Sequence, residues 1–146
     1  MDIEGLLKSF NTHKVRYVII GATAFFPHGY ARATFDIDVF IQPCAANAQR
    51  AWNALRDFGY DVSDVTVTGL LTKKLLIRQY AVDTDIHPFV AGVTFERVWQ
   101  HRVRAKFGHT IAAFASLNDL IRMKRAAGRP KDREDLKYLQ RLRRAA

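Results

Sequence analysis

Apolar and polar residues follow two different periods along this chain, and together they predict a mixture of helices and strands. Apolar residues three or four apart are typical of amphipathic helices, whereas short apolar runs between turn residues are typical of strands. We expect helices over residues 2–11, 22–29, 45–59, 94–105, 116–128 and 129–146. We expect strands over residues 15–20, 33–42, 64–69, 73–79, 81–90 and 109–115. The pattern predicts a single α+β domain over residues 1–146, with a catalytic α/β core over 1–115 and basic helices over 116–146.

The strand expected over residues 33–42 carries two carboxylates among its apolar residues. Asp36 and Asp38 lie two positions apart, so both side chains project from the same face of the strand. Like charges at this spacing repel each other unless water surrounds them or a cation lies between them. Aspartate is disfavoured in strands, and paired carboxylates are suitable ligands for Mg²⁺. The alternatives are a solvent-exposed face and a metal site, and we favour the metal site.

Two other segments can contribute to the same chemistry. Gly21 lies between a strand and a helix, where the backbone N–H groups of the helix N-terminus can bind phosphate, although many such turns use glycine for geometry alone. Asp83 and Asp85 alternate with apolar residues in the strand expected over 81–90. If that strand pairs beside the first acidic strand, one of these aspartates completes a triad able to hold two Mg²⁺ ions about 4 Å apart.

Composition and charge narrow the classes of protein that the chain can represent. Of its 146 residues, 49% are hydrophobic and 25% are charged, which is typical of a soluble globular protein. We expect a cytoplasmic protein without membrane association, because no long apolar run or signal peptide is present and Cys44 is the single cysteine. The net charge is +9, and ten of the 23 Lys and Arg residues lie between Arg122 and Arg144. This cluster predicts either a solvated helix face or a surface that attracts polyanions.

The ordered motifs resemble those of minimal nucleotidyltransferases in the DNA polymerase β superfamily. Gly21 and Ala22 are followed by 13 residues and then by the sequence DIDV at 36–39. The stretch HGYARATFDID is similar to the branch that includes nucleotidyltransferases of abortive-infection and toxin–antitoxin systems. DIHPFVAGVTFERVW resembles the third-carboxylate strand of that branch, and LNDLIRMKRAAGRPKDREDLKYL resembles its C-terminal signature. The resemblance implies the polymerase-β-like fold, a mixed β-sheet flanked by helices with a helical C-terminal third.

The resemblance also implies an enzyme that transfers a nucleoside monophosphate from an NTP and releases pyrophosphate, with two Mg²⁺ ions as cofactor. Asp36, Asp38 and Asp85 would be the metal ligands and, with Lys124, the catalytic residues. Asp85 would lie nearest the acceptor hydroxyl, and Lys124 would bind the triphosphate. The residues implied at the nucleotide are Gly21, Ala22, Thr23, His28, Arg32, Lys124, Arg129 and Asp132.

Some of these assignments have alternatives. Ala22 replaces the glycine or serine that is frequent in the superfamily, so Thr23 or backbone N–H groups would have to bind the phosphate oxygen instead. His28 would contact the nucleotide or hold its own loop, and Arg32 would meet a phosphate, shield the carboxylates or be solvated. Asp132 and Asp135 would orient Lys124 or Arg129, or stabilise the start of the last helix.

More than one class of molecule could be the acceptor of the transferred nucleotide. A basic C-terminal region favours RNA, such as a tRNA 3′ end, and a protein hydroxyl is the next candidate. The resemblance adds a cognate toxin or antitoxin as a possible partner. The alternative from a different class is a catalytically degenerate fold that binds nucleic acid or a partner protein, and Ala22 and the basic C-terminus favour it.

Overall fold

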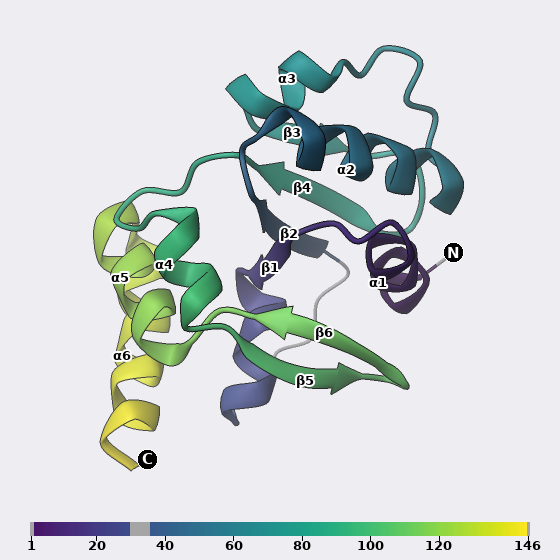
Figure 1. The fold of residues 1–146 in the computed structure, drawn as a ribbon. Coiled ribbons are helices and arrows are strands. Elements are labelled where there is room, and N and C mark those ends of the chain that lie inside the picture. The colour runs from purple at the N-terminus through teal and green to yellow at the C-terminus, as the bar shows by residue number, and fades with distance from the viewer. Residues whose placement is uncertain (1, 30–35, 146) are drawn as a thin grey trace.

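The computed structural model describes residues 2–29 and 36–145, which form a mixture of helices and strands (Figure 1). The strands are β1 (Tyr17–Ile20), β2 (Asp36–Ile41), β3 (Leu75–Ile77), β4 (Asp83–His87), β5 (Val103–Phe107) and β6 (Thr110–Phe114). The helices are α1 (Ile3–Thr12), α2 (Ala45–Phe58), α3 (Val67–Thr72), α4 (Phe95–Gln100), α5 (Leu117–Ala127) and α6 (Pro130–Ala145), with a 3₁₀-helix, η1 (Ala22–His28).

The strands form one mixed sheet in the order β3-β4-β2-β1-β6-β5. β2 runs parallel to β4 and β1 runs parallel to β6, whereas the remaining neighbours are antiparallel. A parallel pair needs a crossover connection, and the chain between β2 and β4 supplies one that contains α2, α3 and β3. β2 therefore lies inside the sheet, between β1 and β4.

Helices pack against the sheet in two groups (Figure 1). α1 packs against α2, and α2 against α3, whereas α4, α5 and α6 are grouped at the C-terminal end of the fold. The core is built from apolar residues of both the helices and the strands, and Leu6, Phe10, Ile37, Val39 and Phe114 are completely buried. Ile37 and Val39 alternate along β2 with the more exposed Asp36 and Asp38, as side chains on opposite faces of a strand must.

Two predictions about individual elements are wrong. Residues 64–69 were expected as a strand because they are rich in Val and Thr, but Val67–Thr72 forms α3. The Thr66 side chain caps this helix by accepting a hydrogen bond from the Gly69 N–H at 2.9 Å, and Leu70 anchors it in the core. Local capping and burial outweigh β propensity, which depends strongly on context.

The second error concerns the helix expected over residues 94–105. That helix ends at Gln100, and Val103–Phe107 forms β5, which pairs with β6. The spacing of Phe95, Val98, Trp99 and Val103 matches a helical period, so the pattern predicted a helix that continues past Gln100. A tight turn joins β5 to β6 between the paired residues Phe107 and Thr110, and Gly108 in this turn has a φ of 64°. Gly108 is therefore the residue in the sequence that could have indicated a hairpin and an additional strand.

The predicted α+β class, with a mixed sheet and a helical C-terminal third, is confirmed. Within residues 2–29 and 36–145, none of the helices has the length and apolar character required to cross a membrane.

Candidate active site

The acidic residues of β2 and β4 lie on one face of the sheet because the two strands pair in register. Asp38 pairs with Asp85, and Asp36 pairs with Asp83. Directly paired residues project to the same side, so the face carries carboxylates from both strands. Asp36 and Asp38 therefore share a face, as their spacing predicted, and the structure brings Asp85 beside Asp38.

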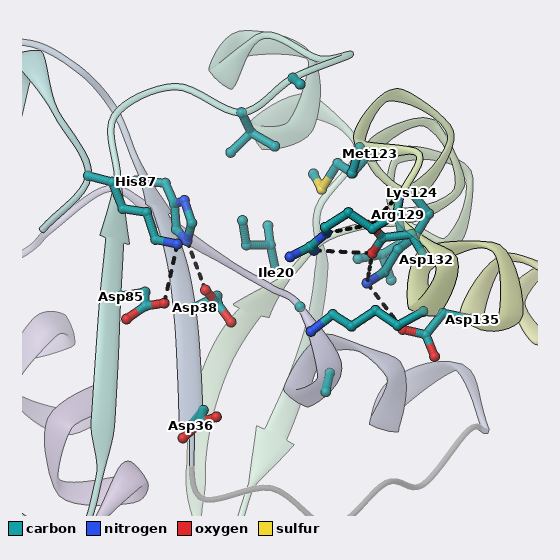
Figure 2. Close-up of a pocket in the computed structure, with 18 residues that line it drawn as sticks. Ile20, Asp36, Asp38, Asp85, His87, Met123, Lys124, Arg129, Asp132 and Asp135 are labelled. Carbon is teal, nitrogen blue, oxygen red and sulfur yellow. Dashed lines mark hydrogen bonds and ion pairs between the residues drawn. The ribbon is translucent and has the colours of Figure 1, made fainter. Parts of the chain in front are cut away.

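Three side chains on this face converge closely enough to hold one ion (Figure 2). Asp38, Asp85 and His87 each place one oxygen or nitrogen within 4.8 Å of the others. His87 Nε2 lies 2.8 Å from Asp38 Oδ1, which is the distance of a hydrogen bond. Asp36 is not part of this group and lies farther along β2, at its first residue (Figure 2).

Two cations from the β3 region contact the carboxylates of β4. Arg78 donates a hydrogen bond from Nη1 to Asp85 Oδ1 at 2.7 Å, and its Nε lies 3.7 Å from Asp83 Oδ2. Lys74 Nζ lies 3.5 Å from Asp85 Oδ2. The hydrogen bond to Asp85 is the main reason that the pKa of Arg78 lies above its ordinary value. These contacts offset part of the repulsion among the aspartates, and they also mark the place where positive charge is favourable.

Gly21 brings the backbone of the β1–η1 turn directly against Asp38. Its φ of 72° and ψ of −161° belong to a region that is nearly closed to other residues. A Cβ at this position would lie 2.7 Å from Asp38 Oδ2, well inside van der Waals contact. The turn therefore requires glycine for two independent reasons, its conformation and its closeness to the carboxylate.

A group of ion pairs on α5 and α6 faces the acidic group across the cavity (Figure 2). Lys124 Nζ lies 3.0 Å from Asp132 Oδ1 and 3.2 Å from Asp135 Oδ2. Arg129 Nε donates to Asp132 Oδ2 at 2.6 Å, and the Arg129 backbone N–H donates to the same oxygen at 3.1 Å. Both aspartates thus contact Lys124, and Asp132 also holds Arg129.

Burial and hydrogen bonding act in opposite directions on Asp132. The side chain is fully buried, which alone would raise the pKa of its carboxyl group. The hydrogen bonds from Arg129 and Lys124 outweigh burial and hold the pKa of Asp132 well below its ordinary range. The same hydrogen bond from Arg129 raises the pKa of the Arg129 guanidinium. Asp132 is therefore an anion that fixes two cations at the rim of the cavity.

The acidic group and the ion pairs line one cavity of about 590 Å³, a volume within the usual range of small-molecule sites. Lys74 and Lys131 add positive charge to its wall, and apolar side chains also line it. The apolar residues are Ile20, Ala22, Val90, Ala91, Leu120, Met123 and Ala127. The cavity thus has the acidic group of β2 and β4 on one side, with Lys74 beside it, and the ion pairs of Lys124 and Arg129 on the other.

Some of the other residues expected to bind the nucleotide line the cavity, and others do not. Gly21 and Ala22 line the cavity, whereas Thr23 and His28 are not among its lining residues. The Thr23 hydroxyl donates to the Asp36 carbonyl at 3.0 Å, and His28 Nε2 lies 2.8 Å from the Ala115 carbonyl oxygen. Thr23 therefore holds η1 against β2, and His28 holds it against the residue that follows β6. Arg32 lies outside the described residues.

Sequence reasoning missed His87 and Lys74 as residues of the cavity. His87 follows Asp85 by two positions on the same strand, so alternation alone places both on one face. This signal was available once residues 81–90 had been predicted as a strand. Lys74 approaches Asp85 because β3 pairs with β4, and a pairing between strands cannot be deduced from either segment alone.

The donor set fits a divalent cation. Carboxylate oxygens and an imidazole nitrogen are ordinary metal ligands, and here they come from paired strands whose positions are set by the core. A sheet-borne carboxylate group, a glycine turn beside it and a partly buried lysine across the cavity are the features that the sequence resemblance implies for a nucleotidyltransferase. The family model described as "Nucleotidyltransferase of unknown function (DUF6036)" matches residues 2–142, and the chain belongs to this family. Comparison with curated proteins gives no match.

Proposed function

We propose that this protein is a metal-dependent enzyme that transfers a nucleoside monophosphate from an NTP to a macromolecular acceptor. One observation carries the proposal. The group formed by Asp38, Asp85 and His87 and the ion-paired Lys124 line the same cavity from opposite sides. An NTP needs both kinds of wall, because its phosphates are anionic and are normally bound as a metal complex.

Asp38 and Asp85 would hold the metal, with Asp36 able to contribute from the same strand face. Mg²⁺ is the ion that the family resemblance implies. A divalent ion bound there would offset the charge on the phosphates and on the attacking and leaving oxygens. Gly21 contributes by its lack of a side chain, because any Cβ would occupy the space next to Asp38 Oδ2.

Lys124 would bind the triphosphate as a positioned point charge. Its ammonium group is held by Asp132 and Asp135, and only 13% of its side chain is exposed, so its position is largely fixed before the nucleotide arrives. Arg129 is more exposed and reaches the same cavity, where it can bind a second phosphate oxygen. Fixed donors of this kind lower the cost of ordering the charged substrate.

The acceptor supplies a hydroxyl group that attacks the α-phosphorus of the NTP. The bond between the acceptor oxygen and phosphorus forms as the bond to pyrophosphate breaks, and the acceptor loses its proton. Asp85 is the candidate to receive that proton, because it borders the cavity and keeps partial exposure. Its hydrogen bond from Arg78 would have to rearrange when the substrate binds.

RNA is the acceptor that the charge distribution favours. Arg133, Lys137 and Arg141 follow the cavity residue Arg129 at intervals of four, and all are exposed. Residues at this spacing lie along one side of a helix, so positive charge extends from the cavity along α6. A phosphate backbone can follow such a stripe. A protein hydroxyl is the alternative acceptor, and a toxin–antitoxin or phage-defence role follows from the family resemblance.

A second candidate function is a degenerate fold that only binds nucleic acid or protein. Ala22 offers no hydroxyl to a phosphate, and Arg78 and Lys74 already contact Asp85. Such a protein would bind RNA through α6 without transferring a nucleotide to it.

Incubation of the purified protein with each α-labelled NTP, divalent metal and cell lysate distinguishes the two functions. We expect label to appear on RNA with the wild type and not with Asp38→Asn, which removes one charge from the metal group and is expected to leave the fold intact. Asp64→Asn is the matched control, because Asp64 is exposed and lies outside the cavity. Label on protein instead of RNA would mean that the acceptor is a protein hydroxyl. No label with any NTP, or equal label with Asp38→Asn, would overturn the proposal.

A further inference from the structure

His87 distinguishes this candidate metal site from one built of carboxylates alone. It belongs to the converging group, and its side chain is 16% exposed, so it lies at the inner wall of the cavity. We propose that His87 is a direct metal ligand and that it gives the site a preference for Mn²⁺ over Mg²⁺. This inference rests on the proposed function insofar as both need a divalent ion at Asp38 and Asp85.

The distances are those of neighbouring ligands on one ion. Metal–oxygen and metal–nitrogen bonds of about 2.1 Å at right angles place two donor atoms about 3 Å apart. His87 Nε2 and Asp38 Oδ1 are 2.8 Å apart, and the Asp85 oxygen lies within 4.8 Å of both. An ion could therefore be bound without a large movement of the two strands.

The position of His87 follows from the backbone. Asp85 and His87 are alternate residues of β4, and Asp38 is paired with Asp85 across the strands. His87 is itself paired with Phe40, which is buried and packs edge-to-face on Phe95 at 5.3 Å between ring centroids. This packing fixes β2 beside His87, and a fixed ligand loses little conformational freedom when the metal arrives.

The identity of the ion follows from the donor atoms. Mg²⁺ is a hard ion that takes oxygen ligands and gives up its water reluctantly. First-row transition ions accept imidazole, and among them Mn²⁺ also suits carboxylate, water and phosphate oxygens. Two carboxylates and one imidazole, with the remaining positions left to water and the NTP, form a donor set that suits Mn²⁺ better than Mg²⁺.

A positioning role is the competing explanation for the same contact. In that case His87 donates a hydrogen bond from Nε2 to Asp38 and orients a carboxylate that binds Mg²⁺ with no nitrogen ligand. In the ligand role, Nε2 uses its lone pair for the metal and the neutral ring carries its proton on Nδ1. The two roles differ in whether a nitrogen atom is bonded to the ion.

Binding of Mn²⁺ alone, followed by electron paramagnetic resonance, tests the inference without any transfer reaction. For the wild type we expect Mn²⁺ to bind at least about tenfold more tightly than Mg²⁺ in competition, and pulsed spectra to show coupling to a histidine nitrogen. His87→Gln keeps an amide donor near Asp38 but removes the imidazole. It should lose the nitrogen coupling and at least about tenfold in Mn²⁺ affinity, with a change below about threefold for Mg²⁺.

His109→Gln serves as the control, because His109 is exposed and lies outside the cavity. It should keep the wild-type affinities and spectrum. Equal losses for Mn²⁺ and Mg²⁺ in His87→Gln, or no nitrogen coupling in the wild type, would overturn the ligand role and leave the proposed function standing. If the wild type binds neither ion, or if Asp38→Asn binds both unchanged, the metal site and the proposed function fail together.

Discussion

Asp38 is the residue on which most of the local geometry converges. It pairs with Asp85 through the sheet, contacts His87 and borders the Gly21 turn. Its immediate neighbours in β2, Ile37 and Val39, are fully buried on the opposite face. The carboxylate is therefore held by the backbone and the core, and its surroundings tolerate little added volume.

Gly21→Ala tests how closely the turn and the carboxylate are fitted. The new Cβ would lie 2.7 Å from Asp38 Oδ2, and the φ of 72° is strained for alanine. We expect a loss of about 1–3 kcal/mol in the free energy of unfolding and a strong loss of metal affinity, because Asp38 must move. Denaturant unfolding and metal titration measure the two effects.

Gly29→Ala is the control for strain alone. Gly29 also has a positive φ, 90°, but the nearest atom to its Cβ would be Leu142 Cδ2 at 3.9 Å. We expect a stability loss of about 1 kcal/mol with metal affinity unchanged. If both variants bind metal as the wild type does, closeness to Asp38 is not what requires glycine at position 21.

At the scale of elements, α5 and α6 are joined by a buried charge group as well as by apolar contacts. Asp132, at the start of α6, accepts hydrogen bonds from Lys124 of α5 and from Arg129 between the helices. Leu120, Ile121 and Leu139 supply the apolar part of this region of the core. The arrangement links the stability of the C-terminal helices to the residues that line the cavity.

Asp132→Asn should destabilise the protein by about 2 kcal/mol near neutral pH, since it removes the charged acceptor that pairs with the partly buried Lys124 and with the more exposed Arg129. The pKa of Asp132 is lowered by folding, so the carboxylate stabilises the fold fully above the unfolded value of about 3.9. This contribution is lost as the pH falls below that value towards the folded pKa. The stability difference between variant and wild type should therefore shrink in acid, as urea unfolding over a pH series would reveal.

Glu134→Gln provides the comparison for this prediction. Glu134 is exposed on the same helix, and its substitution should change stability by less than about 0.5 kcal/mol. Equal effects of the two variants would mean that the buried ion pairs add nothing beyond surface charge.

Local patterns predicted most elements but not their pairing. The helices α1 and α5 were predicted from their apolar spacing, and in the structure Asp2 and Ser116 cap them by accepting a hydrogen bond from a first-turn N–H. α3 and β5 were missed because β-branched residues and an accidental helical spacing favoured other structures. The alternation that places Asp36 and Asp38 on one face is a local property and was predicted. The approach of Lys74 to Asp85 is not local, because it depends on which strands become neighbours.

For the whole molecule, charge is the property that the sequence predicted most directly. The excess of Lys and Arg gives a net charge of +9, and much of it lies on exposed positions of α6 beside the cavity. The cavity itself combines distant segments, since β2 and β4 supply one wall and α5 and α6 the other. A polyanion bound along α6 would approach the site from the basic side.

Replacing Arg133, Lys137 and Arg141 together by glutamine tests this path. The slope of log K against log salt is negative, and each phosphate contact contributes about −0.7 to it for single-stranded RNA. The loss of three contacts should therefore make the slope less negative by about 2. Fluorescence anisotropy with a labelled RNA oligonucleotide over a salt series measures the slope.

A triple variant with the same charge change elsewhere separates a local path from overall attraction. Lys8, Lys14 and Lys106 are exposed and lie outside the cavity and α6, so their replacement by glutamine should leave the slope nearly unchanged. If both triples reduce it equally, RNA responds to net charge alone and α6 has no special role.

The pairing of Asp38 with Asp85 has one more consequence, which concerns misfolding. Successive side chains of a strand point to opposite faces, so a slip of β4 by a single residue would turn Asp85 and His87 away from Asp38. Such a chain would keep nearly the same helix and strand content and would look normal by circular dichroism. Metal uptake therefore reports on correct assembly of this protein more sensitively than any measurement of secondary structure.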